Sequence, residues 1–181
     1  MEQIYTIPVN EAFEKVQEEG FCTCPFCLMY NRLEDKELDL ILGASMMEPD
    51  VRLKTNEAGF CPEHLSLMFE RGKRLPLALM LESHLDSIAK DIDGNMSSLF
   101  IGKTADNAAK RLDKLEHSCY ICDRIEYNIS RMIETAALLW QNDEKFREKA
   151  SRAPYFCLNH YGKYIRAAKE RLSKKEFADF Y

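Results

Sequence analysis

The sequence predicts an all-α fold made of two pseudo-repeat helical halves and a short extended N-terminal arm. Along most of the 181 residues, apolar side chains recur at the three- and four-residue spacing of amphipathic helices. No clean alternation of apolar and polar residues, the mark of a half-buried strand, follows the first ten residues. A pattern of cysteine and histidine residues occurs twice, which indicates an internal duplication.

The N-terminal arm is expected at residues 4–9, Ile-Tyr-Thr-Ile-Pro-Val, which is the only strand-like segment. Pro8 cannot donate a backbone hydrogen bond, so such a segment belongs at a sheet edge or in an extended arm. Asn10 is then expected to cap a helix that continues to Glu19 and ends at Gly20.

Helix signals continue through the first half, which we expect to span residues 1–94. Apolar residues from 28 to 42 have helical spacing. Pro49 suits the first turn of a short helix, and Gly59 suits its end. Residues 75–92 are interpreted as a core helix that ends near Gly94.

The second half, residues 95–181, shows the same kind of pattern after a boundary near residues 93–98, where Gly, Asn and Ser gather. Helices are expected over residues 97–115 and 157–172, and at helical positions from Ile125 to Leu138. Ser173 and Glu176 have the spacing of a capping box, which predicts a last short helix.

The composition is that of a soluble globular protein, with 46% hydrophobic and 30% charged residues. The longest apolar run, residues 75–81, is far shorter than the roughly 20 residues of a membrane helix. The N-terminus lacks the basic and apolar regions of a secretory signal, so we expect a cytoplasmic protein. In that reducing compartment, clustered cysteines bind metal or carry out redox chemistry more often than they form disulfides.

The repeated pattern is CxxC followed, after a long interval, by CxxH. The interval is 33 residues in the first half and 34 in the second. The eight residues are Cys24, Cys27, Cys61, His64, Cys119, Cys122, Cys157 and His160. Buried apolar cysteines are common singly, but eight Cys and His residues that repeat in phase favour metal ligands.

Three cysteines and one histidine are a standard ligand set for structural zinc, and each half supplies one set. We therefore expect two zinc ions per chain, each held by the four ligands of one half. Each pair is expected where a helix begins, and the positive end of the helix dipole would stabilise the thiolates there. The ions are expected to fasten the start of one helix to the start of another and to contribute most of the stability of each half.

Three further residues could take part in chemistry but have simpler interpretations. Cys22 is expected to be a spare thiol near the first site, with a role as exchange ligand or redox sensor as the alternative. His117 is expected to support the second site or face solvent, and His84 to be partly buried and hydrogen-bonded.

Other activities fit the sequence less well. The Cys-Pro-Phe-Cys segment at 24–27 resembles the active site of glutaredoxins, but the polar helix expected before it replaces the buried strand of that fold. Four protein ligands leave no open position for a catalytic water, so we expect no enzyme activity. The basic residues from Lys163 to Lys175 suggest nucleic acid, although a net charge of −5 weakens that reading.

Beside the paired motifs, residues 4–13, 74–81 and 172–176 of the chain resemble a bacterial family of unknown function defined by duplicated CxxC…CxxH halves. The resemblance covers nearly the whole length and implies metal binding and a bacterial cytosolic setting, without a catalytic residue. The sequence therefore favours a zinc-binding helical scaffold with a protein partner and no membrane contact. The alternatives are a redox-responsive zinc-thiolate protein or thiol-disulfide oxidoreductase, and a nucleic-acid-binding zinc protein.

Overall fold

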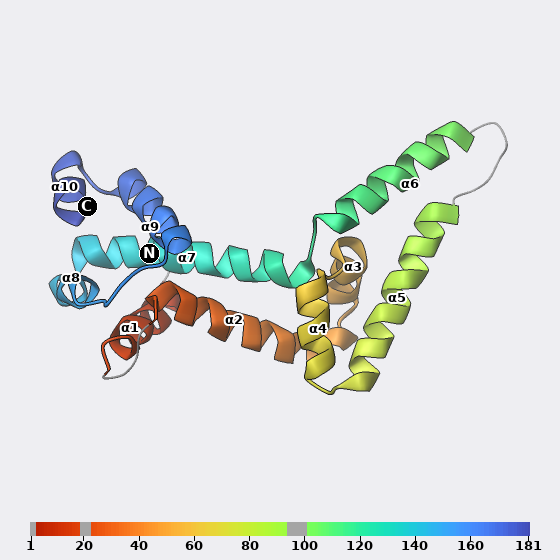
Figure 1. Ribbon diagram of the computed structural model, residues 1–181, viewed down its shortest axis with the longest axis horizontal. Coiled ribbons are helices and arrows are strands. Elements are labelled where there is room, and N and C mark those ends of the chain that lie inside the picture. Colours follow the sequence, from red (N-terminus) through yellow and green to blue (C-terminus); the bar gives the residue numbers. More distant parts are fainter. Residues whose placement is uncertain (1–2, 19–22, 94–100) are drawn as a thin grey trace. The chain divides into compact units, whose positions relative to one another are not determined.

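The computed structural model describes residues 3–18, 23–93 and 101–181, and every regular element in those ranges is a helix (Figure 1). The α-helices are α1 (Thr6–Lys15), α2 (Pro25–Ile41), α3 (Pro49–Ala58), α4 (Pro62–Glu70), α5 (Arg74–Asp93), α6 (Ile101–Glu116), α7 (Tyr120–Asn142), α8 (Glu144–Ser151), α9 (Leu158–Arg171) and α10 (Lys174–Phe180). Two short 3-10 helices, η1 (Gln3–Tyr5) and η2 (Ala44–Met47), complete the list. The all-α prediction is confirmed. In these ranges no helix combines the length and apolar character needed to cross a membrane.

The chain divides into two compact units. Unit 1 combines Met1–Glu34 with Ile125–Tyr181, and unit 2 is Asp35–Arg124. Both boundaries fall inside helices, α2 and α7, so each of these helices contributes residues to both units. The compact units therefore differ from the predicted halves 1–94 and 95–181. The expected linker falls largely on residues 94–100, which lie outside the described residues.

The N-terminal segment is helical, so the predicted extended arm is wrong. Pro8 lies in the first turn of α1, where a backbone N–H has no partner within the helix, and proline is tolerated there. Asn10 is not the predicted cap but an interior residue whose side chain donates to the Thr6 carbonyl at 3.0 Å. Val9 and Phe13, one helical turn apart, are fully buried.

The core of unit 1 is built around aromatic rings. Phe13 of α1 contacts Phe26 of α2 edge to face, with ring centroids 5.5 Å apart, and Phe146 of α8 at 4.9 Å. Phe26 also meets Tyr164 of α9 at 5.0 Å. Such pairs add about 0.5–1.5 kcal/mol each beyond the burial of their area. Because the rings come from four helices, they hold the starts of α2 and α9 in one packed layer.

Unit 2 has an aliphatic core to which α2, α4, α5 and α7 contribute. The fully buried members are Leu38, Ile41, Leu42, Met68, Met80 and Ile121. Helix α5 was predicted as a core helix, and its extent is confirmed, but only Leu77 and Met80 are buried while Leu75 and Leu85 are 68% and 62% exposed. The predicted core helix is therefore only partly buried, through Leu77 and Met80 near its start.

Several local signals match the structure closely. Pro49 occupies the first position of α3, and Gly59 ends that helix with φ 66°. Helix α9 covers the expected range to within one residue at each end. Ser173 and Glu176 form the predicted capping box at the start of α10.

Candidate metal centres

All four Cys and His pairs lie at helix N-termini, as the sequence predicts. The two CxxC pairs open α2 and α7, and the two CxxH pairs open α4 and α9. Each helix begins one residue after the first cysteine of its motif. At such an end the backbone N–H groups are free and the helix dipole is positive, so thiolates are stabilised there.

The CxxH pairs share one capping geometry. Cys61 and Cys157 are the N-cap residues of α4 and α9, with extended backbone angles (φ −69°, ψ 159° and φ −70°, ψ 150°). The sulfur of each accepts a hydrogen bond from the backbone N–H of the histidine three residues later, at 3.5 Å in both cases. The cap therefore places a sulfur and an imidazole on the same side of the first helical turn.

The first cluster, which we call site 1, joins Cys24 and Cys27 at the start of α2 to Cys157 and His160 at the start of α9. The sulfurs of Cys27 and Cys157 are 3.6 Å apart. Nδ1 of His160 lies 3.4 Å from the Cys27 sulfur and 3.2 Å from the Cys157 sulfur. Cys24 and His160 are buried, whereas Cys27 and Cys157 are partly exposed.

The second cluster, site 2, joins Cys61 and His64 at the start of α4 to Cys119 and Cys122 at the start of α7. Nδ1 of His64 lies 3.2, 3.4 and 3.3 Å from the sulfurs of Cys61, Cys119 and Cys122. The sulfurs of Cys61 and Cys122 are 3.9 Å apart. Within each site all four donor atoms lie within 4.8 Å of one another, so either group could hold a metal ion.

The predicted pairing of the motifs is wrong. Each CxxC pair was expected to meet the CxxH pair of its own half, but it meets that of the other half. Consequently site 1 belongs entirely to unit 1 and site 2 entirely to unit 2. The eight residues still form two groups of three cysteines and one histidine, and each group still fastens two helix starts together.

The electrostatics of site 2 favour one thiolate–imidazolium pair in the metal-free protein. The hydrogen bond to Cys119 is the main cause that raises the pKa of His64 to about 9. Burial alone would raise the pKa of Cys119, but hydrogen bonds from His64 and from backbone N–H groups lower it to about 6. Burial and the neighbouring sulfurs raise the pKa of Cys122. A metal ion must therefore displace protons from this site.

Site 1 has a different charge pattern. Burial first, and then the adjacent sulfurs, raise the pKa of Cys27 to about 12, and burial also raises the pKa of Cys24. Burial and the nearby Lys163 lower the pKa of His160, which favours the neutral ring that a metal ion requires. Three sulfurs in so small a space repel one another when ionised, and a cation between them would remove that repulsion.

Aromatic packing supports site 1 directly. Phe26, between the two cysteines of α2, lies 6.1 Å from the His160 ring, and Tyr30 lies 6.3 Å from it on the next turn. Phe156, which precedes Cys157, packs on Phe26 at 5.8 Å. The ligand pairs of site 1 are therefore held against the aromatic core of unit 1.

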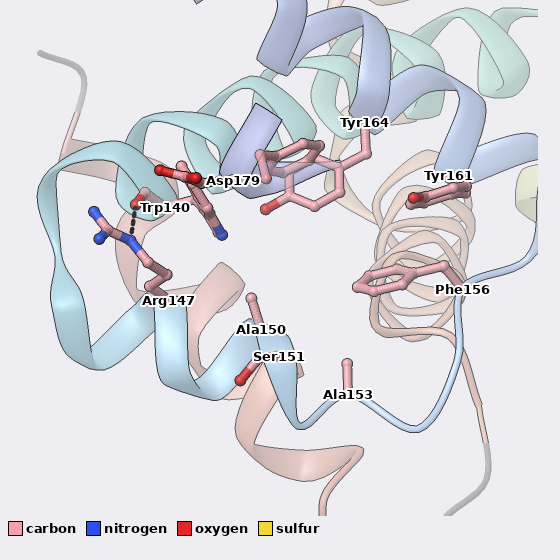
Figure 2. Close-up of a pocket in the computed structure, with 10 residues that line it drawn as sticks. Trp140, Arg147, Ala150, Ser151, Ala153, Phe156, Tyr161, Tyr164 and Asp179 are labelled. Carbon is pink, nitrogen blue, oxygen red and sulfur yellow. Dashed lines mark hydrogen bonds between the residues drawn. The ribbon is translucent and has the colours of Figure 1, made fainter. Parts of the chain in front are cut away.

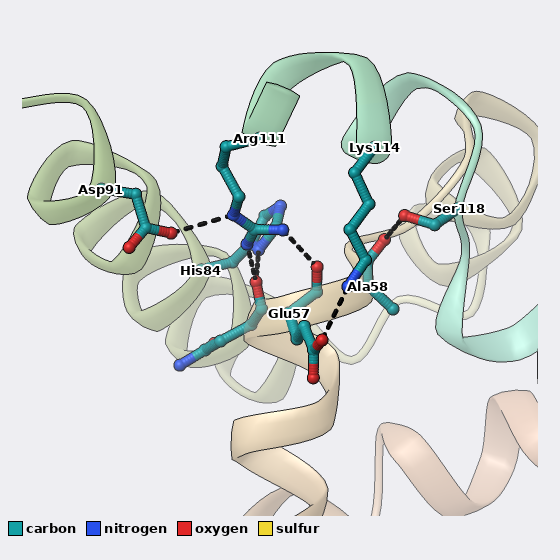
Figure 3. Close-up of polar contacts among 8 residues, drawn as sticks. Glu57, Ala58, His84, Asp91, Arg111, Lys114 and Ser118 are labelled. Atoms are coloured by element: carbon teal, nitrogen blue, oxygen red, sulfur yellow. Dashed lines mark hydrogen bonds and ion pairs between the residues drawn. The ribbon is translucent and has the colours of Figure 1, made fainter. Parts of the chain in front are cut away.

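A polar network supports site 2 by capping the end of α3, three residues before Cys61 (Figure 3). Arg111 donates to the carbonyls of Asn56 and Glu57 at 2.7 and 2.5 Å, and forms an ion pair with Asp91 at 2.9 Å. Ser118, just before Cys119, donates to the Ala58 carbonyl at 2.7 Å.

The same network joins the two ligand pairs of site 2 through the backbone. The N–H of Tyr120 donates to the Gly59 carbonyl at 3.0 Å, which places the start of α7 against the segment that leads to Cys61. A positive side chain at a helix C-terminus is favoured by the helix dipole, which explains Arg111. Sequence reasoning missed this network, because no motif marks its members.

The remaining candidate residues are not ligands in these clusters. His117 is exposed, and its Nδ1 lies 2.8 Å from the Asp113 carbonyl. His84 is partly buried with Nδ1 3.1 Å from the Asn56 carbonyl, which confirms its predicted role, and burial lowers its pKa. Cys22 lies outside the described residues. In the basic segment, Lys163 pairs with Glu126 at 2.6 Å and Arg171 with Glu134 at 2.6 Å.

A comparison with models of known protein families matches residues 1–181 to a family of unknown function, DUF6062, so the chain belongs to that family. The expected membership in a family of unknown function is thereby confirmed. Neither the curated proteins nor the solved structures contain a match to this chain.

Proposed function

We propose that this member of DUF6062 is a helical scaffold that binds two structural zinc ions, in sites 1 and 2, and acts by contact with another protein. The observation that carries the zinc assignment is the size and composition of the two clusters. A tetrahedral zinc with Zn–S of about 2.3 Å and Zn–N of about 2.0–2.1 Å separates sulfurs by about 3.8 Å and sulfur from nitrogen by about 3.6 Å. The sulfur–sulfur distances of 3.6 and 3.9 Å in the structure agree closely with these values, and the sulfur–nitrogen distances of 3.2–3.4 Å are slightly shorter.

The same distances argue against disulfides. A disulfide bond is about 2.05 Å long. The cysteines described in the structure are all free, and the sulfurs are 3.6 Å apart in the Cys27–Cys157 pair and 3.9 Å apart in the Cys61–Cys122 pair. Three sulfurs and one Nδ1 are also soft enough to select zinc over magnesium or calcium, which prefer oxygen ligands.

A structural role follows from the number of ligands. Four protein ligands complete the tetrahedron, so no coordination position remains for a catalytic water. Zinc binding contributes on the order of 10 kcal/mol in small domains, comparable with the whole stability of a typical fold. A protein partner is favoured over nucleic acid because the net charge is −5 and two cations of the basic segment already pair with glutamates.

The metal content of the native protein tests the proposal. Plasma mass spectrometry after exhaustive dialysis should give two zinc per chain, the value expected for two complete four-ligand sites. Removal of zinc by a chelator should greatly lower the melting temperature. Asn159→Ser, an exposed substitution between two ligands, is the control and should keep both ions. Iron in place of zinc, or an unchanged melt after chelation, would contradict the proposal.

A redox-responsive role is the second candidate, and the exposure of the ligands favours it. Each site has two partly exposed cysteines, whose sulfurs are 3.6 Å apart in site 1 and 3.9 Å apart in site 2. Hydrogen peroxide could take two electrons from such a thiolate pair, giving one disulfide and two hydroxide ions and releasing the metal. Zinc release at low peroxide, reversed by dithiothreitol, would support this role. Release only on global unfolding would exclude it.

A further inference from the structure

A cavity of about 510 Å³ lies in unit 1, beside the segment that carries the site 1 ligands (Figure 2). This volume is within the range of about 300–1,000 Å³ that is typical of small-molecule sites. Its lining comes from α7, α8, α9, α10 and the segment before Cys157. The metal ligands themselves are not part of the lining, so a ligand there would leave site 1 intact.

One wall of the cavity is a row of aromatic rings. Trp140 meets Phe180 edge to face at 5.2 Å, and Phe180 meets Tyr164 at 4.8 Å. Phe156 continues the row, 5.9 Å from Tyr164 and 5.9 Å from Tyr161. The rings are held from behind by the core, since Tyr164 and Trp140 are only 2% and 8% exposed. The buried rings of Tyr164 and Trp140 thus form the base of this wall, and the partly exposed rings of Phe156, Tyr161 and Phe180 are the ones against which the flat face of another ring can stack.

The opposite wall consists of small side chains. Figure 2 shows Ala150 and Ala153 across the cavity from the rings of Tyr164 and Phe156. Ser151, between them, turns its hydroxyl back to the Glu148 carbonyl at 2.7 Å. Because these side chains are short, a slot remains between the two walls. A slot between aromatic and small side chains suits a flat ring system.

Two charged groups of opposite sign line the same cavity. Arg147 donates to the carbonyls of Trp140 and Gln141 at 3.1 and 3.2 Å, and its guanidinium lies 4.7 Å from the centre of the Trp140 ring. Those acceptors are neutral. The Glu176 carboxylate interacts electrostatically with Arg147, but no carboxylate of the described residues forms an ion pair with it. Asp179 likewise has no ion-pair partner in the described part of the chain, and both groups lie near Trp140 (Figure 2).

From these observations we infer that the cavity binds a flat aromatic compound with a carboxylate and an ammonium group at one end, the chemistry of an aromatic amino acid. The ring occupies the slot, the carboxylate faces Arg147 and the ammonium faces Asp179. Burial of the ring supplies most of the affinity. Arg147 and Asp179 are exposed, so solvent screens their charges. Each is expected to raise the affinity for the matching ligand charge by twofold to about fivefold, which corresponds to an exposed ion pair of up to about 1 kcal/mol.

Calorimetric titration of the zinc-loaded full chain with three indole compounds tests this site. L-Tryptophan should bind at one per chain, twofold to fivefold more tightly than tryptamine, which lacks the carboxylate, or indole-3-propionate, which lacks the ammonium. In Arg147→Gln the advantage over tryptamine should disappear. In Asp179→Asn the advantage over indole-3-propionate should disappear. Loss of neither advantage, or no binding of any of the three compounds, would overturn the assignment.

Closing the slot gives an independent test. Ala153→Leu should weaken L-tryptophan at least tenfold, while Ala105→Leu, the same change at an exposed position on α6, should leave it unchanged. Zinc content and melting temperature report whether each variant is folded, and Ala153→Val replaces the leucine variant if that one unfolds. Equal affinity in the wild type and a folded position-153 variant would place the binding elsewhere and refute the proposed site. Failure here with two zinc ions bound would leave the metal assignment standing.

Discussion

The crossed pairing of the motifs can be tested by counting metal ions in two double variants. Cys27 and Cys157 belong to site 1, whereas Cys61 belongs to site 2. Cys27→Ser with Cys157→Ser therefore damages one site twice and should leave one zinc per chain. Cys27→Ser with Cys61→Ser damages both sites and should leave none. A pairing within each half predicts the reverse order, so the two variants separate the alternatives without a structure.

The expected size of the effect follows from the ligand count. Two lost thiolates leave site 1 with one sulfur and one imidazole, which removes most of the roughly 10 kcal/mol that a structural zinc contributes. Because the net stability of a domain is about 5–15 kcal/mol, unit 1 should unfold while unit 2 keeps its own site. Hydrogen exchange with mass spectrometry should then show lost protection in α9 and retained protection in α4.

Plasma mass spectrometry supplies the count, with Glu63→Gln as the control, since this exposed residue lies between two site 2 ligands and should keep both ions. One zinc in the variant with Cys27 and Cys61 changed, together with none in the variant with Cys27 and Cys157 changed, would refute the crossed arrangement.

Four further changes probe the supports of the two sites. Gly59→Ala should cost about 1–3 kcal/mol in urea unfolding, because φ is 66° and the new methyl group would lie 3.0 Å from Nε2 of His84. Phe13→Ala should cost about 3–5 kcal/mol by the same measurement, since the side chain is fully buried among aromatic rings. Arg111→Gln removes two hydrogen bonds to carbonyls in the last turn of α3, so the free energy of unfolding should fall by about 1–3 kcal/mol. The control Lys110→Gln, at the exposed neighbouring position, should change it by close to zero. Burial lowers the pKa of His84, so as pH falls below about 6.5 the unfolded chain takes up a proton at this histidine before the folded chain does. The free energy of unfolding, measured in urea, should therefore fall with pH more steeply in the wild type than in His84→Gln.

Local sequence signals predicted those features that depend on a few neighbouring residues. The capping box at Ser173, the proline that opens α3 and the glycine that ends it each fix a helix end through one turn of backbone. The CxxC and CxxH pairs likewise indicated ligands at helix starts, because the spacing within a pair fits a single turn. The prediction of an extended N-terminal arm was wrong for a local reason as well. Pro8 fits an edge strand and the first helical turn equally, and the burial of Val9 and Phe13 selects the helix.

These local signals could not predict which CxxC pair meets which CxxH pair, because both pairings give the same ligand set of three cysteines and one histidine. Chain entropy favours the pairing within halves. Cys61 follows Cys27 by 34 residues, whereas the observed partners Cys27 and Cys157 are 130 residues apart. The cost of the longer closure is only about 1.2 kcal/mol, because it grows with the logarithm of loop length. One aromatic pair in the unit 1 core, such as Phe13 and Phe26, contributes a free energy of similar size. Packing can therefore decide which CxxH pair each CxxC pair meets.

Helix length is the physical reason that packing favours the crossed arrangement. Helix α2 has 17 residues and, at 1.5 Å per residue, carries the chain about 25 Å from the cysteines at its start. For Cys61 to reach those cysteines, the chain would have to return over the same distance, and α3, with 10 residues, spans only about 15 Å. Helix α3 packs instead against α5 and α6, so the CxxH pair stays with unit 2. The 23 residues of α7 likewise carry the chain about 34 Å from Cys119 and Cys122, and the eight-residue α8 packs on α1 within unit 1. Each of the two long helices begins at a CxxC pair and carries the chain away from it, so the CxxH pair that follows in the sequence joins the other site.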